Sequence, residues 1–307
     1  APMYVLLLAC APTYLPLPTD DTAGAASADS GEGDTGRDGE TGETGGGADS
    51  GDDSAEDSGV DPGAWLAAVD VYINLGDSVA AGYDAQDDGG YGWLLQRNLD
   101  DDFPGYEGVD LSSRSSASVK HITESGATSR DVLGNLQDAN LPAASGTVIV
   151  TISAGGNDFN DDYTTMISAE AAREAGEKYA DNLGDMVDLL RDEYTDVRIF
   201  VLNVQDPTDG EGTIPPGYDE GMCELLDKYG DVYGETAVAN LGIFNDAIAD
   251  AAAAEGVELL DYHGWFAGHG LNSRDGWMSD DCAHPTSEGH HQLRRLAWSA
   301  WTGELYD

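Results

Sequence analysis

Basic residues are the scarcest feature of this sequence. Its 307 residues include 13 lysines and arginines against 59 aspartates and glutamates, a formal net charge of −46. Nucleic acids and anionic membrane surfaces attract proteins through basic patches. We therefore expect no nucleic-acid partner. The acidity fits high solubility or a saline habitat, in which salt screens the self-repulsion of the chain.

Motifs for metal and nucleotide binding are also missing. The chain has no His-Glu-x-x-His, no Cys-x-x-Cys, no Walker loop and no Gly-x-Gly-x-x-Gly. These patterns mark zinc sites, phosphate-binding loops and dinucleotide folds. The acidic clusters lack the spacing of a calcium loop, so we expect solvated surface there and neither a metal nor a cofactor.

No apolar run is long enough to span a bilayer. Residues 3–9 are apolar and end at Cys10, but a spanning helix needs roughly 20 such residues. Leu7-Leu8-Ala9-Cys10 resembles a bacterial lipobox, which implies a diacylglyceryl group on Cys10. No Lys or Arg precedes the run, so we expect the basic part of the signal to be absent or truncated. A stray apolar terminus is the alternative.

Bulky apolar residues are absent from a long acidic segment. Residues 20–63 contain no Leu, Ile, Phe, Tyr or Trp, and they carry 14 acidic residues and one Arg. Such a segment buries too little apolar surface to offset its ordering entropy. The composition therefore divides the chain into a lipobox-like signal remnant at 1–17, a disordered acidic linker at 18–63 and one folded domain at 64–307, which holds all six Trp.

The folded part alternates strands and helices. Residues 69–75 alternate apolar and polar side chains, which predicts a strand, and the β-branched run at 147–153 predicts a strand buried on both faces. The pattern predicts further strands at 108–113, 197–203 and 257–260, and helices at 91–98, 131–137, 170–193, 240–255 and 286–301. This alternation indicates a parallel sheet covered on both faces by helices.

Chemically useful residues follow the strands. In open α/β sheets, ligands bind beyond the carboxyl ends of the strands. Gly76-Asp77-Ser78 ends the first strand, and Gly155-Gly156-Asn157-Asp158 follows the buried one. Gly126 lies in a loop of small residues, and the last loop holds Asp281 and His284. Each feature alone is also found in ordinary turns.

Together these four blocks resemble the SGNH, or GDSL, hydrolases, in the order of that family and over residues 76–284. The resemblance implies a three-layer α/β/α sandwich with a mostly parallel five-stranded sheet of flavodoxin-like order. It implies Ser78 as nucleophile, His284 as its base and Asp281 as the group that orients the imidazole. It assigns the oxyanion hole to the backbone N–H groups of Ser78 and Gly126 and to the side-chain amide of Asn157.

Neighbouring polar residues have structural interpretations. Asp281 could merely cap its loop, with Asp280 beside it easily mistaken for it. We expect Asp77 to bond turn amides. We expect His290 and His291 to face solvent on the last helix. His263 and His269 are less favoured candidates for lining a substrate pocket.

The interpretation is a cofactor-free serine hydrolase of carboxylic esters. We expect a monomer outside the cytoplasm, lipid-anchored to the bacterial cell envelope or secreted, that touches membranes only through Cys10. Small-molecule esters, lipids and acylated glycans are its expected substrates. A lipid esterase or lysophospholipase competes with a glycan O-deacetylase; residues 206–210 and 266–270 favour the lipid type. A non-catalytic surface binding module and an acidic stalk are the rival classes.

Cysteines are few. Cys10 belongs to the lipobox-like run, which leaves Cys223 and Cys282. Two cysteines in an extracytoplasmic domain are expected to pair. Such a disulfide would anchor the loop that carries Asp281 and His284. The alternative is two free buried thiols.

Overall fold

The computed structural model describes most of the folded part of the chain. It covers residues 65–66, 68–86, 89–100, 118–160, 162–218, 223, 234–273 and 275–303. The expected lipidation site at Cys10, the acidic linker at 18–63 and the expected strand at 108–113 lie outside these residues. The proposed domain limits at 1–17, 18–63 and 64–307 therefore stay predictions.

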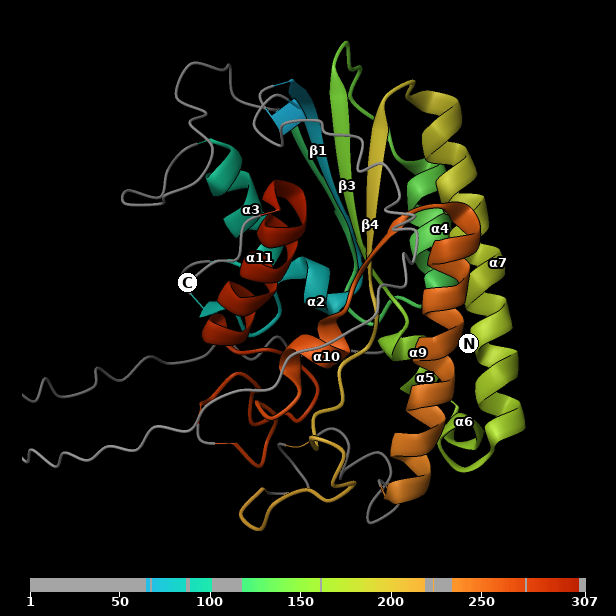
Figure 1. Ribbon diagram of the computed structural model, residues 1–307, viewed down its shortest axis with the longest axis vertical. Coiled ribbons are helices and arrows are strands. Elements are labelled where there is room, and N and C mark those ends of the chain that lie inside the picture. The colour runs from blue at the N-terminus through green and yellow to red at the C-terminus, as the bar shows by residue number, and fades with distance from the viewer. Residues whose placement is uncertain are drawn as a thin grey trace, which may run out of the picture. The chain divides into compact units, whose positions relative to one another are not determined.

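A five-stranded sheet forms the centre of the fold (Figure 1). Its strands are β1 Val69–Gly76, β2 Ser118–Thr123, β3 Thr147–Ser153, β4 Val197–Leu202 and β5 Glu258–Leu260. They lie in the order β2-β1-β3-β4-β5, and every pair is parallel. The α/β class and the flavodoxin-like strand order are thus confirmed.

Helices cover both faces of this sheet. Figure 1 shows α3 Tyr91–Leu99 and α11 Ser287–Thr302 on one side of it, and α4 Ser129–Asp138, α7 Ala169–Glu193 and α9 Glu235–Glu255 on the other. Four short helices, which the sequence did not predict, follow strand ends or connect longer helices: α2 Ser78–Ala81, α5 Gly156–Asn160, α6 Tyr163–Ile167 and α10 Tyr262–Phe266. The three layers expected from the alternation of elements are present.

The longest helix shows why these segments are helical. The side-chain oxygen of Ser168 accepts a hydrogen bond from the amide of Ala171 and so caps α7. Buried residues then recur every three or four positions along the helix, which gives it one apolar face. Gly176 lies against α9, where an added Cβ would come within 2.6 Å of the Cβ of Ala247. The two helices can approach closely because this position has no side chain.

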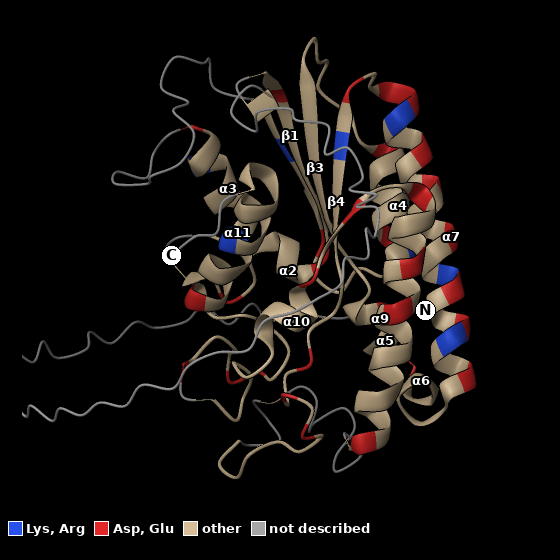
Figure 2. Cartoon of the chain, in the orientation of Figure 1, with Lys and Arg blue, Asp and Glu red and all other residues tan. Residues whose placement is uncertain are grey.

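Charged residues run along the outer helices. Figure 2 shows Asp and Glu spread along α7, with Lys and Arg between some of them. None of the helices in the described part of the chain combines the length and the apolar character that a membrane span requires.

One edge strand was not predicted. β2 has the sequence Ser-Val-Lys-His-Ile-Thr, and only Ile122 in it is buried. Its pairing with β1 is nevertheless regular from Val71 to Gly76. An edge strand with polar side chains gives a weak apolar pattern, so its place in the sheet depends on backbone pairing with β1.

The strands end at a common edge. Gly76, the last residue of β1, is in register with Thr123 of β2 and Ser153 of β3. Ser153 is in register with Leu202 of β4, which pairs with Leu260 of β5. The residues that follow all five strands therefore emerge together at the carboxyl edge of the sheet.

We predict that Gly76→Ala strongly destabilises the fold. The φ angle of Gly76 is 150°, and an added Cβ would lie 2.0 Å from the carbonyl oxygen of Ser153. β1 and β3 would have to separate, so we expect a loss of roughly 3 kcal/mol or more in the free energy of unfolding, measured by urea denaturation.

Gly134→Ala is the matched control. Gly134 lies inside α4, and an added Cβ there meets nothing within 4 Å. This substitution should raise stability by about 0.5–1 kcal/mol, because alanine loses less backbone entropy in a helix. Similar effects of the two substitutions would contradict the close contact at Gly76.

Candidate active site

Ser78 stands at the sharp turn where β1 ends. It is the first residue of α2, and Asp77 caps that helix by accepting a hydrogen bond from the amide of Val79 at 2.9 Å. The amide of Asp77 donates to the carbonyl of Ser153 at 2.9 Å, which ties the turn to β3. Asp77 thus bonds a turn amide, as the sequence predicted. Ser78 is held rigidly at the carboxyl edge.

A hydrogen-bonded chain connects Ser78 to the last loop. The Nε2 atom of His284 lies 2.7 Å from the Oγ atom of Ser78. The Nδ1 atom of His284 lies 2.6 Å from Oδ2 of Asp281. The structure thus brings the three residues together in the order that serine hydrolysis needs: hydroxyl, imidazole, carboxylate.

The carboxylate of Asp281 is held by several donors. Its Oδ1 atom accepts hydrogen bonds from the amides of Ala283 and His284, both at 2.9 Å, and from Oγ of Ser279 at 2.6 Å. Burial by itself raises the pKa of Asp281, but the hydrogen bonds from His284, Ser279 and Ala283 outweigh it and hold that pKa well below its ordinary value. Asp281 stays ionised next to the imidazole. The neighbouring Asp280 is exposed and is not bonded to His284 in this way.

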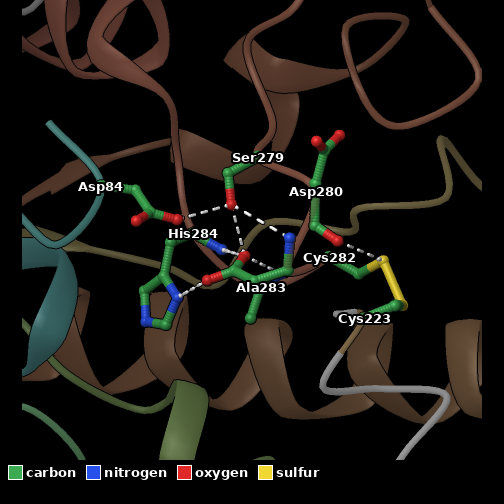
Figure 3. The surroundings of a disulfide bond; sticks show 8 residues. Asp84, Cys223, Ser279, Asp280, Cys282, Ala283 and His284 are labelled. Carbon is green, nitrogen blue, oxygen red and sulfur yellow. Dashed lines mark hydrogen bonds and ion pairs between the residues drawn. A yellow bond between two sulfur atoms is a disulfide. The ribbon is translucent and has the colours of Figure 1, made fainter. Parts of the chain in front are cut away.

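Ser279 is a residue that the sequence analysis missed. Its hydroxyl lies between two carboxylates, 2.6 Å from Asp281 and 2.8 Å from Oδ2 of Asp84 (Figure 3). Its single proton can be donated to only one of these carboxylates at a time. Ser279 links Asp84 to the loop that carries Asp281 and His284, here called the triad loop. A serine two positions before an aspartate is too common in turns to have been a signal.

The predicted disulfide Cys223–Cys282 is present. The two Cα atoms are 5.0 Å apart, and Cys282 lies in the loop between Asp281 and His284 (Figure 3). Cys282 has a φ angle of 64°, which is unusual for a residue other than glycine. The crosslink therefore holds a tightly turned loop that carries both partners of Ser78.

Asn157 and the loop of Gly126 lie beside each other. The side-chain amide of Asn157 donates to the carbonyl of Ala127 at 3.0 Å. The carboxylate of Asp158 accepts hydrogen bonds from the amide and the hydroxyl of Ser129. These bonds join the loops that follow β2 and β3. An amide nitrogen carries two protons, so the bond to Ala127 orients Asn157 and leaves a second N–H for another acceptor.

A cavity of about 90 Å³ opens at Ser78. Polar side chains of Ser78, Asn157 and His284 line it, together with apolar side chains of Phe159, Leu241 and Tyr262. Ser78 and His284 are only 7% and 8% exposed. The reactive hydroxyl is thus nearly buried and faces a small cavity.

Of the other histidines, His290 differs from expectation. His290 was predicted to face solvent, but it is fully buried, and its Nε2 atom lies 3.0 Å from the carbonyl oxygen of Tyr83. Helical position alone does not reveal that α3 and the turn after α2 cover this side of α11. Neither His263 nor His269 is among the described residues that line the cavity. No group of His, Cys, Asp and Glu suited to hold a metal occurs within the described ranges.

Comparison with known families identifies the group to which this architecture belongs. A model of the GDSL-like lipase/acylhydrolase family matches residues 75–292. The chain belongs to the GDSL-like lipase/acylhydrolase family. The match begins at the end of β1 and contains the other four strands, the turn of Ser78 and the loop of His284, so the resemblance seen in the sequence is confirmed.

Solved structures of a lipase, a phospholipase and an esterase share the fold. A lipase from a goat rumen metagenome is 18% identical and covers 77% of this chain and 99% of its own, with a TM-score of 0.53. A phospholipase A1 from Streptomyces albidoflavus is 22% identical, with coverages of 76% and 99% and a TM-score of 0.51. An acetyl xylan esterase from Geobacillus stearothermophilus is 16% identical, with coverages of 78% and 96% and a TM-score of 0.50. No curated protein matched the sequence.

We predict that Asp77→Asn changes how stability depends on pH. Burial raises the pKa of Asp77 from 3.8 to about 6, although the Val79 amide and the charge of His284 lower it. As the pH rises from about 4 to 6, the unfolded chain loses this proton before the folded protein does. Folding stability is therefore lost in that window and is not regained above it.

The asparagine variant lacks this titration but keeps an acceptor for the Val79 amide. Its stability relative to the wild type should rise by up to about 3 kcal/mol between pH 4 and pH 7. Urea denaturation of both proteins at several pH values measures this difference. A difference that does not change with pH would show that Asp77 has the same pKa in the folded and the unfolded protein.

Proposed function

We propose that this GDSL-family protein hydrolyses carboxylic esters through an acyl-serine intermediate. The observation that supports this most directly is the continuous chain from Ser78 through His284 to Asp281, with distances of 2.7 and 2.6 Å. A serine hydroxyl is a poor nucleophile until a neighbouring base takes its proton. Here the base is in hydrogen-bond contact with the hydroxyl at the mouth of a cavity.

In the acylation step, His284 Nε2 accepts the proton of Ser78 while Oγ attacks the ester carbonyl carbon. The C–O bond to the alcohol then breaks, and the same proton passes from His284 to the departing alcohol oxygen. The products are free alcohol and an ester of Ser78. Ionised Asp281 stabilises the imidazolium that exists between these two proton transfers.

Deacylation repeats the sequence with water. His284 accepts a proton from water, the hydroxide attacks the acyl-serine carbonyl, and the proton returns to Ser78 Oγ as the carboxylic acid leaves. Every proton and electron pair is supplied by the ester, by water and by these side chains. The proposed reaction needs no cofactor.

The negative oxygen of each tetrahedral intermediate needs preorganised donors. We assign this role to the backbone N–H groups of Ser78 and Gly126 and to the second N–H of Asn157. Gly126 has a φ angle of 83°, and an added Cβ would meet no atom within 4 Å. Glycine is suited here because its backbone takes this conformation readily and leaves room for substrate.

We also propose that the protein acts as a monomer outside the cytoplasm, secreted or tethered through a lipid on Cys10. The Cys223–Cys282 bond supports the location, because structural disulfides persist in oxidising compartments and are rare in the cytosol. Globomycin-sensitive processing and labelling of the intact protein with a radioactive fatty acid, lost in Cys10→Ala, would test the tether.

We predict that Ser78→Ala abolishes ester hydrolysis and leaves the fold intact. A fluorophosphonate probe should label the wild-type protein and spare the variant, because the probe needs an activated serine. Circular dichroism checks that both proteins are folded. Hydrolysis by the variant at the wild-type rate would refute the mechanism, and a folded wild type that neither reacts with the probe nor hydrolyses esters would indicate a binding module.

We predict that Asn157→Ala lowers kcat by roughly 10²–10³-fold, the usual cost of one oxyanion donor. KM should change much less, since the donor matters most when charge develops on the oxygen. Steady-state kinetics with one p-nitrophenyl ester separates the two constants. An unchanged kcat would mean that Asn157 serves only to hold Ala127.

A further inference from the structure

An exposed aromatic side chain lies against the proposed catalytic histidine. Tyr83 is 44% exposed, and the centroid of its ring is 4.4 Å from that of His284. Few large aromatic side chains in the described part of the chain are as exposed as this one. The mechanism above gives Tyr83 no role, although its ring lies against the imidazole that transfers the proton.

The backbone of Tyr83 is held from two sides. Its amide donates to the carbonyl of Ser78 at 2.9 Å. Its own carbonyl accepts a hydrogen bond from Nε2 of His290 at 3.0 Å. Because Tyr91 donates its amide to Nδ1 of His290, the imidazole proton must be on Nε2. Burial lowers the pKa of His290 to about 4, which keeps the ring neutral near pH 7.

The turn before Tyr83 is also constrained. Gly82 has a φ angle of 78° and ends α2, and an added Cβ there would lie 2.4 Å from the backbone nitrogen of Gly90. The ring of Tyr83 therefore projects from a fixed turn, five residues after Ser78. An aromatic ring offers a large apolar contact area, and a binding site is more precise when its side chains are held in place.

We propose that Tyr83 forms the binding surface for the alcohol part of the ester, while the acyl part occupies the cavity. Preferred substrates then combine a short acyl group with an uncharged alcohol that carries a ring. This inference rests on the proposed ester hydrolysis and specifies its substrate class.

The direction of proton transfer places the alcohol next to Tyr83. The departing oxygen must come within hydrogen-bond reach of His284 Nε2 to receive its proton. Tyr83 packs on the ring of His284 and is not among the described residues that line the cavity. Groups attached to that oxygen can therefore leave the cavity across the exposed face of Tyr83.

The size of the cavity limits the acyl part. Its volume of about 90 Å³ is well below the roughly 300–1,000 Å³ of pockets that enclose drug-sized ligands. An acetyl or butyryl group suits such a space far better than a palmitoyl chain does.

Charge limits the alcohol. No Lys or Arg is among the described residues that line the cavity. The exposed acids Asp84 and Asp280 lie near the triad loop (Figure 3). A phosphate on the alcohol would meet these negative charges, and none of the described cavity-lining residues is basic enough to offset them, so we expect neutral alcohols to be preferred over phospholipid headgroups.

Two ester series test the substrate class in the wild-type protein. The first is p-nitrophenyl esters from acetate to palmitate, in which kcat/KM should fall steeply beyond butyrate. The second keeps the acetyl group and varies the alcohol: ethyl acetate, benzyl acetate and an acetylated methyl xyloside. The benzyl and xyloside arms distinguish an aryl ring from a sugar ring. Lysophosphatidylcholine should be a poor substrate.

Variants test Tyr83 itself. Tyr83→Ala should lower kcat/KM for the ring-bearing acetates roughly tenfold, mainly through KM, and should affect ethyl acetate much less. Tyr83→Phe, which keeps the ring, should restore the benzyl value. Trp93→Ala is the matched control, since Trp93 is 45% exposed but stacks on His121 instead of a triad residue.

The outcomes separate the two levels of inference. If the wild type hydrolyses esters but Tyr83→Ala affects ethyl and benzyl acetate equally, Tyr83 is merely structural and the alcohol surface is refuted. A preference for palmitate or lysophosphatidylcholine overturns the short-acyl assignment. If the folded wild type hydrolyses no ester and fails to react with fluorophosphonate, the proposed function itself fails. Equal fluorophosphonate labelling of Tyr83→Ala and the wild type shows that the triad is intact.

Discussion

The hydrogen bond between Ser78 and His284 joins residues 206 positions apart. Ser78 is fixed by the sheet and α2, but His284 belongs to a loop without regular secondary structure. The bond therefore depends on how firmly that loop is attached. A short antiparallel bridge between Met278 and Pro285 closes the loop, and the amide of Ser279 donates to the carbonyl of His284 at 2.8 Å.

Contacts from outside the loop complete this attachment. The side chain of Gln205, beyond β4, donates to the carbonyl of Ala283 at 2.7 Å. Cys223 bonds Cys282 covalently, and Asp84 meets Ser279 from the turn after α2. Three separate parts of the chain thus hold one loop. Since a displacement of about 1 Å can cost a catalyst much of its rate, this redundancy is what the proposed chemistry requires.

The surroundings of two carboxyl groups near His284 shift their pKa values in opposite directions. Asp77 lies under the turn of Ser78, where burial raises its pKa to about 6. Asp281 has enough donors to outweigh the effect of burial on its pKa. Environments that separate the pKa values of neighbouring acids assign them different tasks. Here Asp77 shapes the turn, and Asp281 carries the charge that faces the imidazole.

The sequence by itself determined the class of the fold and most residues of the candidate site. The alternation in β1, the β-branched run of β3 and the helical spacing in α7 are local patterns that burial imposes directly on the sequence. The order of the four motifs was enough to predict that Ser78, Asn157 and His284 belong to one active site. With Cys10 set aside, Cys223 and Cys282 were the only pair left to join.

Only the tertiary structure decided the features that depend on distant neighbours. The polar strand β2 is defined by its pairing with β1, and His290 is buried because the turn after α2 and the start of α3 lie over it. The contacts of Ser279 with Asp84 and of Tyr83 with His284 span about 200 residues. No local pattern encodes them, because they arise where parallel strands bring the loops of separate segments to a single edge.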